Sequence, residues 1–205
     1  MSEYGRRVIH ASGIGMPLLY LLEIVTWQEL RYFMIAVTGI FLLLEFLRLV
    51  VGLNHWIYDR ATREYEQHTV AGYALAMVSM TAVAVLFGPV VTIPAMAMLI
   101  VGDPVSGMLG DNDPHEHKRI GVIAATFCVC FLLAVPFTVE GATLDSGVAA
   151  AAVGALLGAI ADGIKPILRG VAVDDNLTIP PVAAAGIVAT FWLFGVDAGF
   201  APLWV

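Results

Sequence analysis

Apolar runs of the length of a membrane-spanning helix recur along nearly the whole chain. Residues 30–53 and 120–139 are two of these runs, and both contain few ionisable side chains. A bilayer core about 30 Å thick is crossed by about 20 apolar residues in a helix, whereas the strands of a membrane β-barrel are shorter and alternate in polarity. The hydrophobic share of 60% is also higher, and the charged share of 13% lower, than in ordinary soluble domains. The sequence therefore predicts an all-α, polytopic transmembrane helical bundle in the cell membrane.

We expect about seven spans, joined in a single domain that covers residues 1–205. The expected spans are 12–26, 30–53, 69–87, 90–109, 120–139, 147–164 and 179–196. A tight turn at Gly88-Pro89 separates the third span from the fourth, because proline suits the first turn of a helix. The sixth span is rich in glycine and alanine, which is typical of closely packed helices in a membrane.

The basic residues are distributed unevenly between the two ends of these spans. Nine of the ten Lys and Arg residues fall at alternate connections, which the threading puts on one side: Arg6, Arg7, Arg48, Arg60, Arg63, Lys118, Arg119, Lys165 and Arg169. Only Arg31 is left for the opposite side. Because basic residues concentrate in cytoplasmic loops, we expect the N-terminus in the cytoplasm and the C-terminus outside.

The polar stretch Asp174-Asp175-Asn176-Leu177-Thr178 stands immediately before the last long apolar run. Two adjacent carboxylates in a low-dielectric interior require a cation or a shell of hydrogen-bond donors, since desolvating an unpaired charge costs several kcal/mol. Mg²⁺ held by carboxylate and phosphate oxygens would meet that requirement. The alternative is a solvated loop in which Asn176 or Thr178 caps the following helix.

The threading brings further polar residues to the same cytoplasmic ends. Glu45 and Arg48 are three positions apart on a helix and share a face, so they either form a structural ion pair or contact a substrate. Asp103 is followed first by glycines, at which a backbone can approach a ligand closely, and then by Lys118 and Arg119. A metal–polyphosphate needs an anionic ligand for the metal and cations for the phosphates.

These polar residues occur in an order that resembles a known family. The motifs, in chain order, are Arg6-Arg7-x-x-His10-x-x-Gly13, Glu45-x-x-Arg48, Gly102-Asp103-x-x-Ser106-Gly107-x-x-Gly110, Lys118 with Gly121, and Asp174-Asp175-Asn176-Leu177-Thr178-Ile179-Pro180. Together they resemble the CTP-dependent lipid-alcohol kinases, namely dolichol kinase, phytol kinase and the CTP-using diacylglycerol kinase, which are related to the CDP-diacylglycerol synthases. The resemblance spans nearly the whole chain, and its last motif is the most specific.

The resemblance implies a kinase that transfers the γ-phosphoryl group of CTP to a membrane isoprenoid alcohol of the dolichol or polyprenol type. It implies Mg²⁺ as the cation, the cytoplasmic membrane face as the place of reaction, and segment 103–118 as the nucleotide-binding region. The chain departs from the family in its short acidic loop 111–117 and in Lys118-Arg119-Ile120-Gly121, where relatives usually have Lys-Ser-x-Glu-Gly. It also has Asp162 where relatives usually have a glutamate before the Asp-Asp-Asn motif.

Both lines of argument lead to one set of expected roles. Mg²⁺ is expected on some subset of Asp103, Asp174 and Asp175. One of Asp174 and Asp175 is expected to act as the general base toward the alcohol, with His10 as the rival. The residues expected to contact the nucleotide or the substrate are Arg7, Glu45, Arg48, Gly102, Ser106, Gly107, Gly110, Lys118, Arg119 and Asn176.

Two other functions stay open on the sequence alone. A phosphatidate-type cytidylyltransferase would use the same CTP, but a lipid phosphate would attack the α-phosphate and release pyrophosphate. A small transporter would place ionisable residues near the bilayer midplane, and Glu23 is the one residue that favours this function. The expected partners are the lipid alcohol and the nucleoside triphosphate. A nucleic-acid partner is not expected, and a homo-oligomer stays open.

Overall fold

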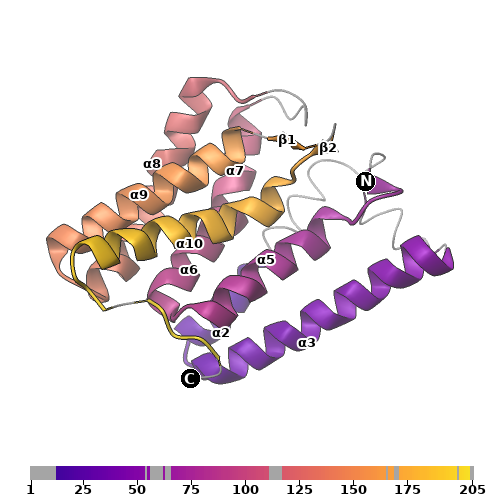
Figure 1. Cartoon of the computed structure of the whole chain (residues 1–205), viewed down its shortest axis with the longest axis horizontal. Helices are drawn as coiled ribbons and strands as arrows, with labels where there is room; N and C mark the ends of the chain where they lie inside the picture. The colour runs from indigo at the N-terminus through magenta and orange to yellow at the C-terminus, as the bar shows by residue number, and fades with distance from the viewer. Residues whose placement is uncertain are drawn as a thin grey trace.

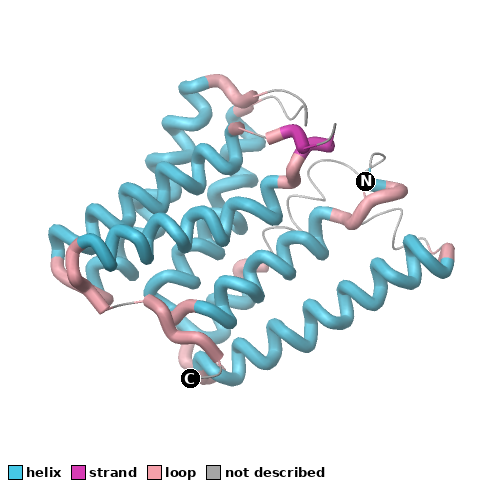
Figure 2. Tube along the Cα trace, in the orientation of Figure 1, coloured by secondary structure: helices cyan, strands magenta, loops and turns pink. Residues whose placement is uncertain are grey.

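Helices make up nearly all of the regular structure, and the strands in the described residues form one small hairpin (Figure 2). The computed structural model describes residues 13–53, 55, 62, 66–110, 117–164, 166–168, 171–197 and 199–203. Within these residues, five helices are long and apolar enough to cross a membrane, and a sixth, α5 (Gly72–Leu86), has 15 residues. The predicted all-α membrane bundle is therefore confirmed.

Two of the helices contain a π-helical segment, in which the backbone hydrogen bonds reach one residue further back. The elements are α2 (Gly15–Leu21), α3 (Trp27–Phe46) with its extension η1 (Leu47–Val51), α5, α6 (Pro89–Ala97), η3 (Met98–Gly102), α7 (Asp103–Leu109), α8 (Ile120–Glu140), α9 (Leu144–Gly163) and α10 (Asp175–Leu193). The elements α6, η3 and α7 together form one span. The antiparallel hairpin of β1 (Ile167–Leu168) and β2 (Val171–Ala172) lies between α9 and α10.

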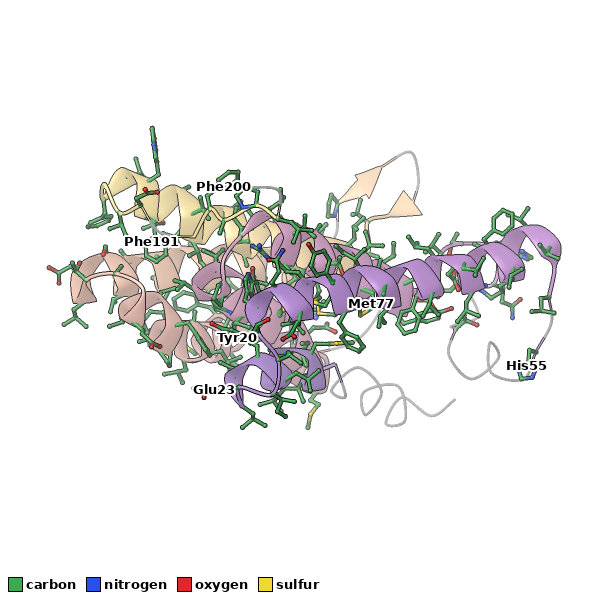
Figure 3. All side chains as sticks on the ribbon, turned by 90° about the horizontal axis from the view of Figure 1, so that it is seen from below. Tyr20, Glu23, His55, Met77, Phe191 and Phe200 are labelled. Carbon is green, nitrogen blue, oxygen red and sulfur yellow. The ribbon has the colours of Figure 1, made fainter. Side chains whose placement is uncertain are left out.

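The long helices lie side by side in the order α8, α9, α10, α5 and α3 (Figure 1). α9 packs against both α8 and α10, whereas α3 stands at the edge and packs mainly against α5. The span α6–η3–α7 packs against α8 and α10. In Figure 3, Tyr20 and Glu23 lie near one end of α3 and His55 lies beyond its other end. α3 therefore runs from the end of the bundle near Tyr20 and Glu23 to the opposite end near His55.

The first predicted span, residues 12–26, is much shorter in the structure than expected. α2 covers seven residues of it, and a helix of that length rises about 10 Å, or about a third of a bilayer core. The helix stops because Glu23 adopts a left-handed backbone conformation with a φ of 56°, after which Thr26 starts α3. Glu23 is exposed in the turn between the two helices, and a transport role for it stays a prediction.

Local sequence signals explain where the helices begin. The Thr26 hydroxyl accepts a hydrogen bond from the Glu29 N–H, and the Glu29 carboxylate accepts one from the Thr26 N–H, which together form a capping box at the start of α3. Pro89 occupies the first position of α6, as the Gly88-Pro89 turn predicts. These signals place the helix boundaries at the expected connections.

α9 and α10 approach closely because small residues face each other in their interface. A Cβ at Gly154 would lie 2.5 Å from Cγ1 of Ile187, and a Cβ at Gly186 would lie 2.7 Å from Cδ1 of Leu157. Both glycines thus permit an approach that a side chain would prevent. The close packing predicted for the sixth span is confirmed, and it brings the end of α9 near the start of α10.

Arg31 ties together the helices at the end where α3 begins. This residue is 5% exposed, and its guanidinium lies 5.4 Å from the centroid of the Trp27 ring. Its Nε donates to the carbonyl oxygen of Ala84 at 2.8 Å, and its Nη2 donates to the carbonyl oxygens of Phe87, at 3.1 Å, and Ala201. Arg31 therefore joins α3, the end of α5 and the C-terminal tail through charge-assisted hydrogen bonds.

We expect Arg31→Met to lower the thermal stability of the purified protein in detergent, because the carbonyl oxygens of Ala84, Phe87 and Ala201 each lose a charged donor, and that of Phe87 keeps only the Thr92 hydroxyl. An unsatisfied buried acceptor costs about 1–3 kcal/mol, so the Tm should fall by roughly 3–10 °C. The unfolding transition followed by tryptophan fluorescence measures this change. Asp145→Asn, at an exposed position, serves as the control. An unchanged Tm for Arg31→Met would contradict the proposed stabilising role.

Candidate active site

The start of α7, the end of α9 and the start of α10 lie at one end of the bundle, near the β1–β2 hairpin (Figure 1). Three carboxylates from these distant parts of the chain meet there. Asp103 is the first residue of α7, Asp162 is the last but one of α9, and Asp175 is the first of α10. Their carboxylate oxygens lie within 4.8 Å of one another. Asp162 and Asp175 are buried, with exposures of 1% and 6%, and Asp103 is half-buried. This group, the acid trio, has the spacing of carboxylates that share a cation.

Lys118 brings a positive charge to the acid trio. Its Nζ lies 2.6 Å from Oδ1 of Asp162 and 2.8 Å from Oγ of Ser106, and its side chain is 5% exposed. Ser106 in turn donates its hydroxyl to Oδ2 of Asp162 at 2.5 Å. The site therefore holds three carboxylates and one ammonium close together. Carboxylate oxygens grouped in this way are the ligands that a hard divalent cation prefers.

Asp174 forms the N-cap of α10. Its Oδ1 accepts a hydrogen bond from the backbone N–H of Asn176 at 2.9 Å and another from Nδ2 of the same residue at 2.7 Å. The helix therefore starts at Asp175, earlier than a cap at Asn176 or Thr178 would place it, because Asp174 already satisfies a free amide of the first turn. Asp174 adjoins the acid trio in sequence but is not a member of it.

A proline near the start of α10 leads to a contact with α5. Pro180 has no N–H to bond the carbonyl oxygen of Asn176, four residues earlier. Ser79 of α5 donates its hydroxyl to that oxygen at 2.6 Å, and both residues are buried. The contact joins α5 to α10 one residue beyond Asp175.

Glu45 and Arg48 form the ion pair that their spacing predicts. Nε and Nη2 of Arg48 lie 3.0 Å and 2.6 Å from the two carboxylate oxygens of Glu45. Arg48 also donates to three backbone carbonyls in residues 66–69, and Glu45 accepts hydrogen bonds from the N–H of Ala71 and the hydroxyl of Tyr73. The pair therefore fastens the end of α3 to the start of α5. A direct contact with substrate stays a prediction.

Glu66 is a further buried carboxylate, and its contacts extend the Glu45–Arg48 network toward α10. It is 4% exposed, and its Oε1 accepts a hydrogen bond from the N–H of Gly72 at 3.1 Å. A Cβ at Gly72 would lie 2.9 Å from Nδ2 of Asn176, so glycine permits the close approach of this amide. Oδ1 of Asn176 is buried and has no hydrogen-bond partner among the described residues. A buried acceptor in this state is available to a cation or to a donor group of a ligand.

Two of the glycines predicted at the nucleotide pack against α8. A Cβ at Gly102 would lie 2.8 Å from Sγ of Cys130, and a Cβ at Gly110 would lie 3.3 Å from Cγ1 of Val122. Gly107 lies between them in α7. All three stand in the segment that carries Asp103 and Ser106, and their contact with nucleotide stays a prediction.

Of the other residues predicted to carry positive charge at the site, the structure describes one and leaves two outside the described residues. Arg119 is exposed at the start of α8, next to Lys118, whose side chain is 5% exposed. Arg7 and His10 lie outside the described residues. Of the predicted site residues, the structure therefore brings together Asp103, Ser106, Lys118 and Asp175, with Asp174 and Asn176 beside them.

Sequence reasoning missed two residues that contact the site or its neighbouring helices, and it considered a third only as a replacement for another residue type. Ser79 and Glu66 were not among the predicted site residues, and Asp162 was considered only in place of a glutamate. Pro180 gives a signal for Ser79, because it predicts a carbonyl in need of a donor. That donor lies 97 positions away in sequence, so only the packing of the helices identifies it.

Comparison with protein-family profiles, with curated proteins and with solved structures finds no match for this chain.

We expect Glu45→Gln and Arg48→Gln each to destabilise the protein, because each leaves a buried charge without its partner. In a double-mutant cycle, the two changes together should cost less than the sum of the single changes, with a coupling energy of about 1–3 kcal/mol. Unfolding in mixed detergent micelles at increasing denaturing detergent measures these energies. A coupling energy near zero would contradict a mainly structural pair.

Proposed function

We propose that this protein is a CTP-dependent kinase that phosphorylates a membrane isoprenoid alcohol of the dolichol or polyprenol type. The observation that carries the proposal is the meeting of the acid trio with the buried ammonium of Lys118 at one end of an apolar helical bundle. Phosphoryl transfer depends mainly on positioning and on charge neutralisation by metal ions and cationic side chains. The order of motifs that resembles the lipid-alcohol kinases supports CTP as the donor.

The residues present fit a magnesium ion. The acid trio offers hard oxygen ligands within 4.8 Å of one another, and Asn176 adds a buried amide oxygen nearby in the chain. Bound there, Mg²⁺ would neutralise charge on the phosphate oxygens of the nucleotide. Asp174, the neighbour of Asp175, remains a further candidate ligand.

In the proposed reaction, the alcohol oxygen attacks the γ-phosphorus of CTP. A bond forms between these two atoms, the bond from the γ-phosphorus to the bridging oxygen breaks, and CDP leaves with the bonding electron pair. The hydroxyl proton passes to a carboxylate and then to solvent. Because Asp175 belongs to the acid trio, we assign this proton transfer to Asp174, and His10 remains the rival base.

The position of the site at the helix ends suits a lipid substrate, because the hydroxyl of a membrane alcohol lies near the bilayer surface while its chain stays in the hydrocarbon. We place this end in the cytoplasm. Arg48, Lys118 and Arg119 lie there, whereas Arg31 lies at the opposite end, and basic residues are more frequent on the cytoplasmic side.

Purified protein incubated with Mg²⁺, labelled CTP and a panel of lipids tests the proposed reaction. We expect label from the γ-phosphate, and none from the α-phosphate, to enter dolichol or another polyprenol. Asp103→Asn should reduce this transfer at least about 100-fold, because it weakens both metal binding and positioning. Asp145→Asn, an exposed position on α9, should leave it unchanged. Label from the α-phosphate in lipid, with release of pyrophosphate, would show a cytidylyltransferase instead.

Asp174→Asn separates the helix cap from the charge. Asparagine caps a helix as well as aspartate does, so the Tm should stay within about 2 °C of the wild-type value. Loss of the carboxylate should lower turnover at least about 100-fold, as expected for a lost general base. Initial rates at saturating CTP and alcohol measure the effect. Full activity in this variant would remove Asp174 from the reaction.

A further inference from the structure

We infer that Asp162 is a positioning residue, which together with Ser106 holds the Lys118 ammonium toward a bound polyphosphate, while Asp103 and Asp175 provide the carboxylates for the metal. This inference rests on the proposed function and divides the acid trio into two roles. Asp162 then acts on Lys118 and, through it, on nucleotide binding. The spacing of the three carboxylates alone would not separate this role from that of a metal ligand.

Both carboxylate oxygens of Asp162 already accept strong hydrogen bonds within the protein. Oδ1 accepts from the Lys118 ammonium at 2.6 Å, and Oδ2 accepts from the Ser106 hydroxyl at 2.5 Å. The side chain is 1% exposed, so these contacts lie in a site closed to bulk water. Moving either oxygen to a metal ion would weaken a charge-assisted hydrogen bond in a buried site, which favours a positioning role for Asp162 over direct binding of the metal.

Hydrogen bonds hold Lys118 both at its backbone and at the end of its side chain. Its backbone N–H donates to the carbonyl oxygen of Gly163 at 3.0 Å, and its Nζ donates to Asp162 and to Ser106. A lysine side chain loses about 2 kcal/mol of rotamer entropy when it is held in one conformation, and here the protein supplies that order before a ligand arrives. The ammonium therefore stands in a set position beside the acid trio.

The ammonium retains one donor for a ligand. A lysine Nζ carries three N–H groups, and the described residues accept hydrogen bonds from two of them. The side chain is 5% exposed, so the remaining N–H has little access to bulk water. A phosphate oxygen brought in by a metal on Asp103 and Asp175 is the chemical group that would complete this shell.

Steady-state kinetics with CTP and a polyprenol, at varied free Mg²⁺, distinguish a positioning residue from a metal ligand. For Asp162→Asn we expect the KM for CTP to rise at least about 10-fold while the Mg²⁺ concentration for half-maximal rate stays within about twofold. Ser106→Ala should raise the same KM by a smaller factor. Asp103→Asn should instead shift the Mg²⁺ requirement upward at least about 10-fold. Asp145→Asn on α9 is the matched carboxylate-to-amide control.

Asp162→Asn leaves Lys118 without its counter-charge and can impair folding, so Ser106→Ala and Asp162→Glu are measured alongside it. Ser106→Ala removes one hydrogen bond and no charge, and Asp162→Glu keeps the carboxylate and should retain tighter CTP binding than Asp162→Asn. A KM for CTP that is unchanged in all three variants would overturn the inference. So would a rise in the Mg²⁺ requirement of Asp162→Asn that equals the rise in Asp103→Asn.

Equilibrium binding of Mg²⁺-tripolyphosphate by titration calorimetry separates this inference from the proposed kinase function. We expect the wild type to bind it, and Asp162→Asn and Ser106→Ala to bind more weakly. If these variants bind more weakly but the wild type transfers no phosphate to lipid, the positioning role stands and the kinase function fails. If lipid is phosphorylated but binding is equal in all variants, the positioning role fails alone. A wild type that binds no tripolyphosphate overturns the positioning role.

Discussion

A charge inside an apolar bundle has to be compensated within the protein, and the arrangement of the helix ends in this chain follows from that requirement. Glu45 is paired with Arg48, and Asp162 is paired with Lys118, each within 2.6 Å. The acid trio gathers three carboxylates beside the Lys118 ammonium. The packing that brings the helix ends together therefore also brings hard oxygen ligands together, and this gives the proposed metal binding its physical basis.

Residues that interrupt regular helix geometry link this charged region to the rest of the bundle. Pro180 leaves the carbonyl of Asn176 to be satisfied by Ser79, and Gly72 lets the amide of the same asparagine approach α5. The π-helix η3 widens the span immediately before Asp103, a feature that is frequent at functional sites. The contacts of Ser79 and Gly72 with Asn176 lie one residue from Asp175, and η3 ends one residue before Asp103. The positions of these carboxylates therefore depend on α5 and η3 as well as on the helices that carry them.

The class of fold could be predicted because apolar length is a local property, and the expected span 120–139 corresponds closely to α8. The gathering of Asp103 with Asp175 could also be anticipated, because alternate ends of antiparallel spans lie on the same side. The pairing of Lys118 with Asp162 could not be predicted in this way, since it joins positions 44 apart and depends on how α9 packs against α8 and η3. The early end of α2 at Leu21, shortly before the left-handed Glu23, is likewise a matter of backbone conformation, which hydropathy does not report.

The two ends of the bundle use similar contacts with different results. Arg31 directs its guanidinium to backbone carbonyls of α5 and the C-terminal tail, and these contacts hold the elements together. Lys118 also bonds to groups of neighbouring helices, but it keeps one N–H beside carboxylates that attract a metal. Ser106 and Asp162 provide a hydroxyl and a carboxylate to Lys118 from α7 and α9, so tertiary contacts between helices that are distant in sequence orient its ammonium.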